Sequence, residues 1–310
     1  MLYIISRGRR LCPPYDLLRT LTPESCFSGA AMKTFLKDCR WGRFLLLRGD
    51  MISIFADLYG EWSELELRLF KTFLTPDSNI VEVGANLGLH SVPLAKLASR
   101  GRIICFEPQR IIFQLLCANI ALNDLTNVFA YHMAVSDEER ELTIQSSDYE
   151  TPWNYGSFSL AQGMSTEGSY PGPVSAERVA AIRLDAFRPV TELPSIALLK
   201  IDAEHHELAV LEGAAEQVAR HRPVIFLENN SEQHGDALIR HVENLGYRPY
   251  WFCDERYQPD NFNRVGIKVP GFDVNMICFP AEREPCSGLV PARTFSDLKD
   301  GKVPLVKRVT

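Results

Sequence analysis

Several features that mark other protein classes are missing from this chain of 310 residues. No apolar run approaches the ~20 residues that cross a bilayer, and the apolar start stops at Arg7, far short of a signal peptide. Positive charge is not in excess: the formal net charge is −6, which disfavours a protein that binds nucleic acid by neutralising phosphates. We therefore expect a cytoplasmic protein with no transmembrane segment and no nucleic-acid partner.

The eight cysteines include no C-x-x-C pair, so a cysteine-rich zinc site is not expected. Cys105, Cys117 and Cys278 lie inside apolar runs. This placement predicts small buried hydrophobic residues in a reducing compartment and not a disulfide framework.

From residue 79 onward the chain contains a regular alternation of apolar strands and amphipathic helices. At this spacing the alternation predicts an α/β fold, with a doubly wound, mostly parallel sheet and helices on both faces. The predicted strands are 79–83, 102–106, 128–133, 196–201, 223–227, 250–252 and 274–279, and the helices lie near 87–99, 111–122, 204–220 and 235–245.

Ahead of this alternation, two local patterns predict an N-terminal hairpin and helix. Apolar runs at 44–47 and 51–55 flank Arg48-Gly49-Asp50, which is typical of a β-hairpin. Ser63 and Glu66 have the spacing of a capping box before an apolar helix face.

The chain therefore divides into an N-terminal extension (1–74), a main domain (75–282) and a C-terminal tail (283–310). An insertion at 146–173 interrupts the main domain and is rich in Ser, Gly and Pro, yet it carries five aromatic residues. A loop of this length is expected either to cover a substrate or to pack on its own aromatic side chains as a surface excursion.

A glycine turn, Gly84-Ala85-Asn86-Leu87-Gly88, follows the first buried strand and precedes a helix, an arrangement that brings a ligand close to backbone amides. Glu107 follows about twenty residues later, where a carboxylate can accept both hydrogen bonds of a ribose diol. A dinucleotide fingerprint needs glycine where this chain has Asn86 and Leu89. Asn86 would crowd a pyrophosphate but can bind an amino-acid moiety, so the turn favours S-adenosylmethionine over NAD. His90 follows the turn and is expected on a helix surface, with contact to the cofactor as the alternative.

Polar residues recur where each predicted strand stops. In doubly wound sheets, ligands bind at the carboxyl ends of the strands, near the point where strand order reverses. We therefore expect these residues to meet in one site: Gly84, Asn86, Gly88, Glu107, Ser136, Asp202, Glu228 and Asn229.

The segment from 79 to 229 resembles the FkbM family of S-adenosylmethionine-dependent methyltransferases. The similar words, in order, are VEVGANLGLHS, GRIICFEPQ, LLCANIALND, MAVSD, LLKIDAEHHELAVLEGA and RPVIFLEN. The resemblance implies a class I methyltransferase (Rossmann-like) fold with a seven-stranded sheet and S-adenosylmethionine as cofactor. It also implies methyl transfer, usually to a hydroxyl of a sugar, a glycan or a related small metabolite.

The matched words also imply roles for individual residues. Asp202, Glu204 and Glu228 would line the reacting face. The cofactor-binding residues would be Glu82, Gly84, Asn86, Gly88 and Glu107, to which we add Ser136. The family usually has glycine where this chain has His205, followed by His206. Either this is a tolerated substitution or one of the two histidines takes part directly.

Methyl transfer to a hydroxyl also requires a group that takes the proton. Asp202 is the first choice and His206 the second, while an N-cap role is the non-catalytic alternative for Asp202. Asp202, Glu228 and Asn229 form a further hypothesis, a Mg²⁺ site, which is the less favoured one. The competing functions are a dinucleotide-dependent oxidoreductase and a catalytically silent cofactor-binding module that recognises a glycan or a protein.

Overall fold

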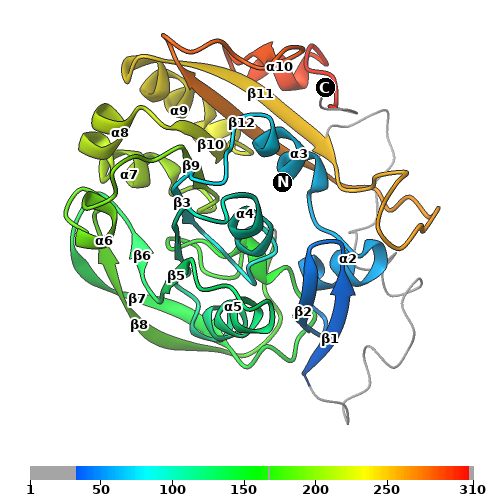
Figure 1. The fold of residues 1–310 in the computed structure, drawn as a ribbon. Helices are drawn as coiled ribbons and strands as arrows, with labels where there is room; N and C mark the ends of the chain where they lie inside the picture. Colours follow the sequence, from blue (N-terminus) through cyan, green and yellow to red (C-terminus); the bar gives the residue numbers. More distant parts are fainter. Residues whose placement is uncertain (1–32, 167, 307–310) are drawn as a thin grey trace.

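The computed structural model describes residues 33–166 and 168–306 (Figure 1). The first 32 residues of the predicted N-terminal extension and the last four of the tail lie outside this part. None of the helices in the described ranges combines the length and apolar character that a membrane span requires.

An eight-stranded sheet in the order β13-β11-β12-β10-β9-β3-β4-β5 forms the centre of the fold. Five neighbouring strands are parallel: β10 (Val224–Glu228), β9 (Leu198–Ile201), β3 (Ile80–Val83), β4 (Ile103–Phe106) and β5 (Val128–Tyr131). The remaining strands β11 (Tyr247–Glu255), β12 (Phe272–Pro280) and β13 (Val290–Pro291) complete the sheet in antiparallel pairing. The predicted doubly wound, mostly parallel sheet is confirmed, with the two-residue β13 added at its edge.

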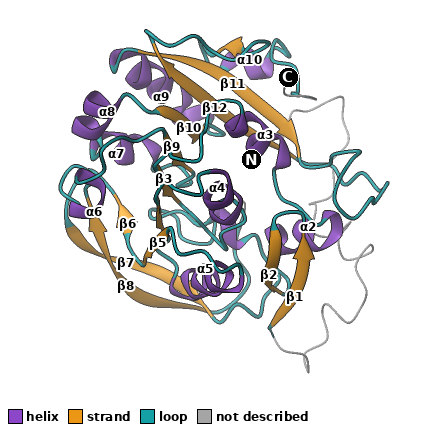
Figure 2. Cartoon of the chain, viewed as in Figure 1, coloured by secondary structure: helices purple, strands orange, loops and turns teal. Residues whose placement is uncertain are grey.

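Helices cover both faces of this sheet (Figure 2). Successive residues of each strand point to opposite sides, and since both sets of side chains are apolar, each face must be buried under helices. Ile80 and Ile103 pack with α3 (Glu64–Lys71), α4 (Ser91–Leu97) and α5 (Arg110–Leu122). Val81 and Ile104 pack with α7 (Glu207–Glu212), α8 (Ala215–His221) and α9 (Glu232–Asn244). Strand order reverses between β3 and β9, which places the switch point beside the glycine turn.

The predicted helix at 204–220 is divided into α7 and α8. Gly213 ends α7, and a Cβ at this position would lie 2.0 Å from the carbonyl oxygen of Ser136. Glu204 and His205 precede α7 with φ of 45° and 72°, so the chain there is left-handed and not helical. The apolar periodicity over 204–220 predicted one helix because it carries no information on these backbone conformations.

The insertion at 146–173 connects two strands of a second sheet, in the order β6-β8-β7. These strands are β6 (Ala134–Val135), β7 (Arg140–Ser147) and β8 (Val174–Ile182), and neither β7 nor β8 was expected from the sequence. Ser147 pairs with Val174, so the intervening residues form the loop of a long antiparallel hairpin. Within the loop, the ring centroids of Trp153 and Tyr170 lie 5.3 Å apart.

The predicted N-terminal hairpin is wrong in its position. The hairpin consists of β1 (Thr34–Cys39) and β2 (Gly42–Leu47), and the run at 51–55 belongs to α2 (Met51–Tyr59). Asp50 causes the difference, because its carboxylate accepts a 2.8 Å hydrogen bond from the Ser53 amide and caps a helix.

Two further sequence expectations are corrected by the structure. The capping box does not form, since the Ser63 hydroxyl donates to Asp273 (3.4 Å) and makes no cap hydrogen bond. Cys105 and Cys278 are buried as predicted, but Cys117 is exposed on α5.

Candidate functional site

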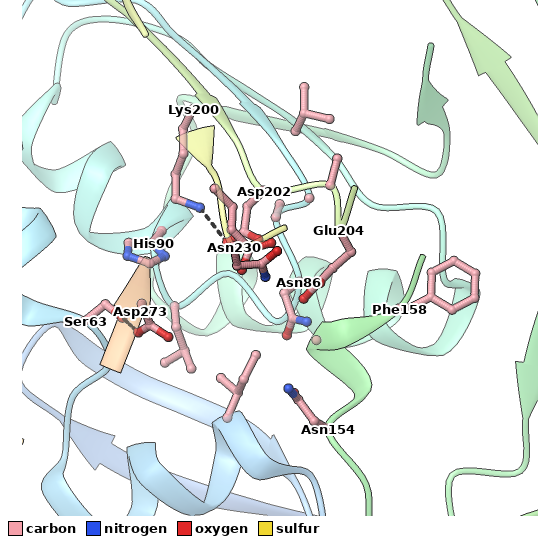
Figure 3. Close-up of a pocket in the computed structure, with 18 of the residues that line it drawn as sticks. Ser63, Asn86, His90, Asn154, Phe158, Lys200, Asp202, Glu204, Asn230 and Asp273 are labelled. Atoms are coloured by element: carbon pink, nitrogen blue, oxygen red, sulfur yellow. Dashed lines mark hydrogen bonds and ion pairs between the residues drawn. The ribbon is translucent and has the colours of Figure 1, made fainter. Parts of the chain in front are cut away.

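A cavity of about 570 Å³ lies at the carboxyl ends of β3, β4, β9 and β10, within the range of small-molecule sites (Figure 3). It is closed by residues of α2, by the start of β12, and by Asn154, Gly156 and Phe158 of the insertion. Six of the predicted site residues line it: Gly84, Asn86, Glu107, Asp202, Glu204 and Glu228. Four other predicted site residues are not among the described residues that line the cavity: Glu82, Gly88, Ser136 and His206.

The two glycines of the turn serve its backbone geometry. Gly84 and Gly88 have φ of 79° and 84°, which side chains rarely adopt. A Cβ on Gly84 would lie 1.8 Å from the carbonyl oxygen of Asp202, so glycine is required where the ends of β3 and β9 meet. The close approach at Gly84 is therefore made by the protein's own chain, and the turn positions Asn86 at the cavity.

Glu107 connects this turn to the end of β4. Its carboxylate accepts the amides of Asn86 (3.0 Å) and Gln109 (2.8 Å). Burial raises the pKa of Glu107 to about 7, against the opposing effect of these two amides. Because a carboxylate offers about four lone-pair sites, two remain for hydroxyl donors.

Gln109 was missed by sequence reasoning. Its side-chain amide donates to the Tyr155 carbonyl (2.9 Å) and thereby attaches the insertion to the cavity wall. The sequence signal for it was its place at the end of the word GRIICFEPQ, two residues after Glu107.

Asp202 lies at the end of β9 and is paired with Lys200, whose Nζ is 3.2 Å from its Oδ2. Burial alone would lower the pKa of Lys200, but the negative charges of Asp202 and Glu82 outweigh it, and the pKa is raised above its ordinary value. Lys200 therefore carries its charge in the cavity wall. The sequence signal for it was a lysine within an otherwise apolar strand. The N-cap alternative for Asp202 is wrong, because α7 begins five residues later with His206 at its N-cap.

Asp202, Glu204 and Glu228 each place one carboxylate oxygen within 4.8 Å of the other two. Burial, and after it the charge of Glu204, raises the pKa of Glu228 well above its usual value. Such a set of oxygens is chemically suited to a divalent cation. Asn229, the third residue of the predicted set, does not line the cavity, and its buried amide nitrogen donates to the Gly235 carbonyl and the Met276 sulfur. The structure therefore brings Glu204, and not Asn229, together with Asp202 and Glu228, and a bound cation stays a prediction.

The backbone at His205 has φ of 72°, a conformation that costs glycine little and that histidine rarely adopts. His205 lines the cavity, and its Nε2 is 3.1 Å from Asn230 Oδ1. His206 turns away from it, with Nε2 3.0 Å from the Ser136 hydroxyl. Burial lowers the pKa of both histidines.

Glu82 lies beneath the glycine turn, where its carboxylate accepts a 2.6 Å hydrogen bond from Ser91. His90 is not on a helix surface as the sequence suggested. It is 7 % exposed, lines the cavity, and faces Glu66 with 3.1 Å between Nε2 and Oε2. In the view of Figure 3 it lies on the same side of the cavity as Ser63 and Asp273.

A family model and several known proteins match this chain in sequence. The family model described as "Methyltransferase FkbM domain" matches residues 82–249. The chain is 29% identical over 250 residues to the AMB antimetabolite synthetase AmbE of Pseudomonas aeruginosa, covering 70% of this chain and 12% of the synthetase. It is 28% identical over 158 residues to Methyltransferase sdnD of Sordaria araneosa, covering 44% of this chain and 61% of that protein.

These matches span less than two thirds of each relative's own length. Among solved structures, the methyltransferase FkbM from Methylobacillus flagellatus KT aligns with 73% of this chain and 50% of its own, at 14% identity and a TM-score of 0.46. The family match covers more than half of the chain and includes the glycine turn, Glu107 and the carboxylates at the ends of β9 and β10. The chain therefore belongs to the FkbM family of methyltransferases.

Proposed function

We propose that this protein transfers a methyl group from S-adenosylmethionine to a hydroxyl of a sugar, a glycan or a related metabolite. The observation that carries the proposal is the position of Glu107. Its carboxylate is held by two amides at the switch point of the sheet, in the same cavity as Asp202 and Glu228. A nucleoside-binding carboxylate next to a group of acidic residues suits a donor and an acceptor bound side by side.

In this proposal Glu107 accepts the ribose diol, and Asn86 contacts the amino-acid end of the cofactor. When bound, the cofactor supplies a methyl group on a positively charged sulfur. The protein contributes mainly alignment, since an in-line displacement gains most from holding the two reacting atoms in position. Asp202, oriented by Lys200, accepts a hydrogen bond from the acceptor hydroxyl.

The acceptor class rests on the walls of the cavity. Trp62 and Phe158 offer flat apolar surfaces of the kind on which a sugar ring stacks. The name of the Pseudomonas relative, an antimetabolite synthetase, supports a small metabolite as a second form of acceptor.

Binding measurements separate this proposal from its alternatives. S-adenosylmethionine and S-adenosylhomocysteine are expected to raise the melting temperature of the protein, and NAD is not. Glu107→Ala should lose the response to both adenosyl ligands. Stabilisation by NAD alone would favour a dinucleotide-dependent enzyme.

Turnover distinguishes an enzyme from a silent cofactor-binding module. The purified protein is incubated with S-adenosylmethionine and a set of methyl glycosides, and S-adenosylhomocysteine is measured by mass spectrometry. Product that depends on the glycoside supports the proposal. Tight cofactor binding without product on any hydroxyl compound would favour the silent module.

A further inference from the structure

A buried histidine–carboxylate pair, His90 and Glu66, forms part of the cavity wall and has no role in the function proposed above. The two residues are 7 % and 4 % exposed, and both line the cavity. The distance between His90 Nε2 and Glu66 Oε2 is 3.1 Å, although the angle falls short of hydrogen-bond geometry. Such misalignment is common at catalytic pairs before a substrate binds.

Glu66 is held in place from behind. The Asn275 side chain on β12 donates a 3.1 Å hydrogen bond to its Oε1, which leaves Oε2 facing the histidine. Glu66 therefore occupies the Nε2 side of the ring. His90 Nδ1 makes no hydrogen bond within the described ranges, so it is the nitrogen available to a bound group.

Most of the charged groups around the pair are carboxylates. His90 faces Glu82 on β3 as well as Glu66, and Glu66 in turn faces Asp254 on β11. Two cations belong to this set. Lys200 interacts with Asp202, Glu82 and Glu66, and Arg256 faces Asp254 and pairs with Asp273. Lys200 is paired with Asp202 at 3.2 Å, whereas Glu66 Oε2 lies 3.1 Å from His90 Nε2.

We propose that His90 is the general base of the methyl transfer and that Glu66 is its positioning residue. This inference rests on the proposed O-methylation. The acceptor oxygen forms a bond to the methyl carbon, the carbon–sulfur bond breaks, and its electron pair remains on sulfur as the thioether. The hydroxyl proton passes to His90 Nδ1, and the resulting imidazolium is stabilised by Glu66 until the proton leaves to solvent. Because the reacting hydroxyl has only one proton, Asp202 then orients the acceptor through a neighbouring hydroxyl and not through the reacting one.

In this arrangement the carboxylate of Glu66 holds His90 in one tautomer, and the other ring nitrogen takes the proton, as in a catalytic triad. An imidazole is also well matched to this task near neutral pH. The sequence favoured Asp202 for the same step, and the two assignments predict different pH behaviour.

The kinetic test compares His90→Gln, Glu66→Gln and Asp202→Asn, with His221→Gln on α8 as the matched control. Methyl α-glucopyranoside is the probe acceptor, and S-adenosylhomocysteine formation is the readout. His90→Gln is expected to lower kcat by roughly 10²- to 10⁴-fold, the range for a general base, and to abolish the decline of kcat at acidic pH. Asp202→Asn should lower kcat/KM but keep that decline.

Calorimetry with S-adenosylhomocysteine measures cofactor affinity in the same variants, and thermal unfolding checks that each one folds. Affinity within threefold of the wild type is expected for His90→Gln. The proposal would be overturned if His90→Gln retained the acidic decline, or if its main effect were a loss of affinity for S-adenosylhomocysteine.

A second measurement needs no acceptor. Nitrogen-15 NMR of histidine-labelled protein saturated with S-adenosylhomocysteine is expected to show His90 with its proton on Nε2. In Glu66→Gln, a mixture of tautomers should replace this single form. An unchanged His90 spectrum in Glu66→Gln would overturn the pairing. Absence of wild-type turnover on every hydroxyl compound would instead contradict the proposed function, so the two failures are distinguishable.

Discussion

Binding of the cofactor should release protons from Glu107, and the amount can be worked out from the structure. Burial raises the pKa of this carboxyl to about 7, so close to half of the molecules carry a protonated Glu107 at pH 7. Two hydroxyl donors of a ribose would favour the ionised form. Binding of S-adenosylhomocysteine is therefore expected to release about half a proton at pH 7, approaching one near pH 6 and falling to about a tenth at pH 8.

The same linkage sets the sign of the stability change. The folded protein binds this proton more tightly than the unfolded chain, whose carboxyl has the model value of 4.5. Below pH 4.5, ionisation of Glu107 therefore does not lower the free energy of unfolding of the ligand-free protein. As the pH rises through 7, the burial of the ionised carboxylate lowers that free energy by about 3 kcal/mol. The rise in melting temperature caused by the ligand should accordingly be larger at pH 8 than at pH 6.

Isothermal titration in phosphate and in Tris, which differ in ionisation enthalpy, measures the number of protons released. Glu107→Gln is the matched variant, because it keeps the size of the side chain and removes the titration. Protons from the ligand's own groups remain in this variant and can be subtracted. Equal proton release in the wild type and in Glu107→Gln would refute the reasoning.

Three further predictions concern the backbone, the buried charge and the metal. Gly84→Ala should lower the free energy of unfolding by at least ~2 kcal/mol and weaken cofactor binding, because the new Cβ would lie 1.8 Å from the Asp202 carbonyl oxygen. The control is Gly266→Ala, where a Cβ meets nothing within 4 Å and urea unfolding should be nearly unchanged. Lys200→Met leaves the carboxylate of Glu82 buried without its cation and should lower the free energy of unfolding by roughly 3–5 kcal/mol at pH 8. The loss should be smaller at pH 5, where Glu82 takes up a proton more readily, and an equal loss at both pH values would contradict the argument. EDTA should leave turnover unchanged, because the Lys200 ammonium already supplies positive charge at Asp202; activity lost in EDTA and restored by Mg²⁺ would show that the acidic cluster holds a metal.

The sheet was predictable from the sequence because its parallel strands are buried on both faces. Continuous apolar runs such as 80–83 and 103–106 have few other interpretations, and their alternation with helices limits the topology. The N-terminal hairpin was less predictable, because an apolar run as short as 51–55 fits a strand or a buried helix equally well. The Asp50 cap decides between them.

The order of residues by itself determined that Gly84, Glu107, Asp202 and Glu228 would meet. Parallel strands have their carboxyl ends at one edge of the sheet, so a residue that follows such a strand is placed there whatever else the chain does. The same argument predicted a nucleoside site at the glycine turn.

Only the tertiary structure decided which other side chains complete the cavity. Glu66 meets Asn275 across 209 positions of sequence, and His90 becomes buried because α3 docks against the turn after β3. No periodicity reports such contacts, since they depend on how separate segments pack and not on local pattern. The meeting of the strand-end residues was therefore predictable from the sequence, whereas the residues proposed here to move the acceptor proton emerged only from the folded chain.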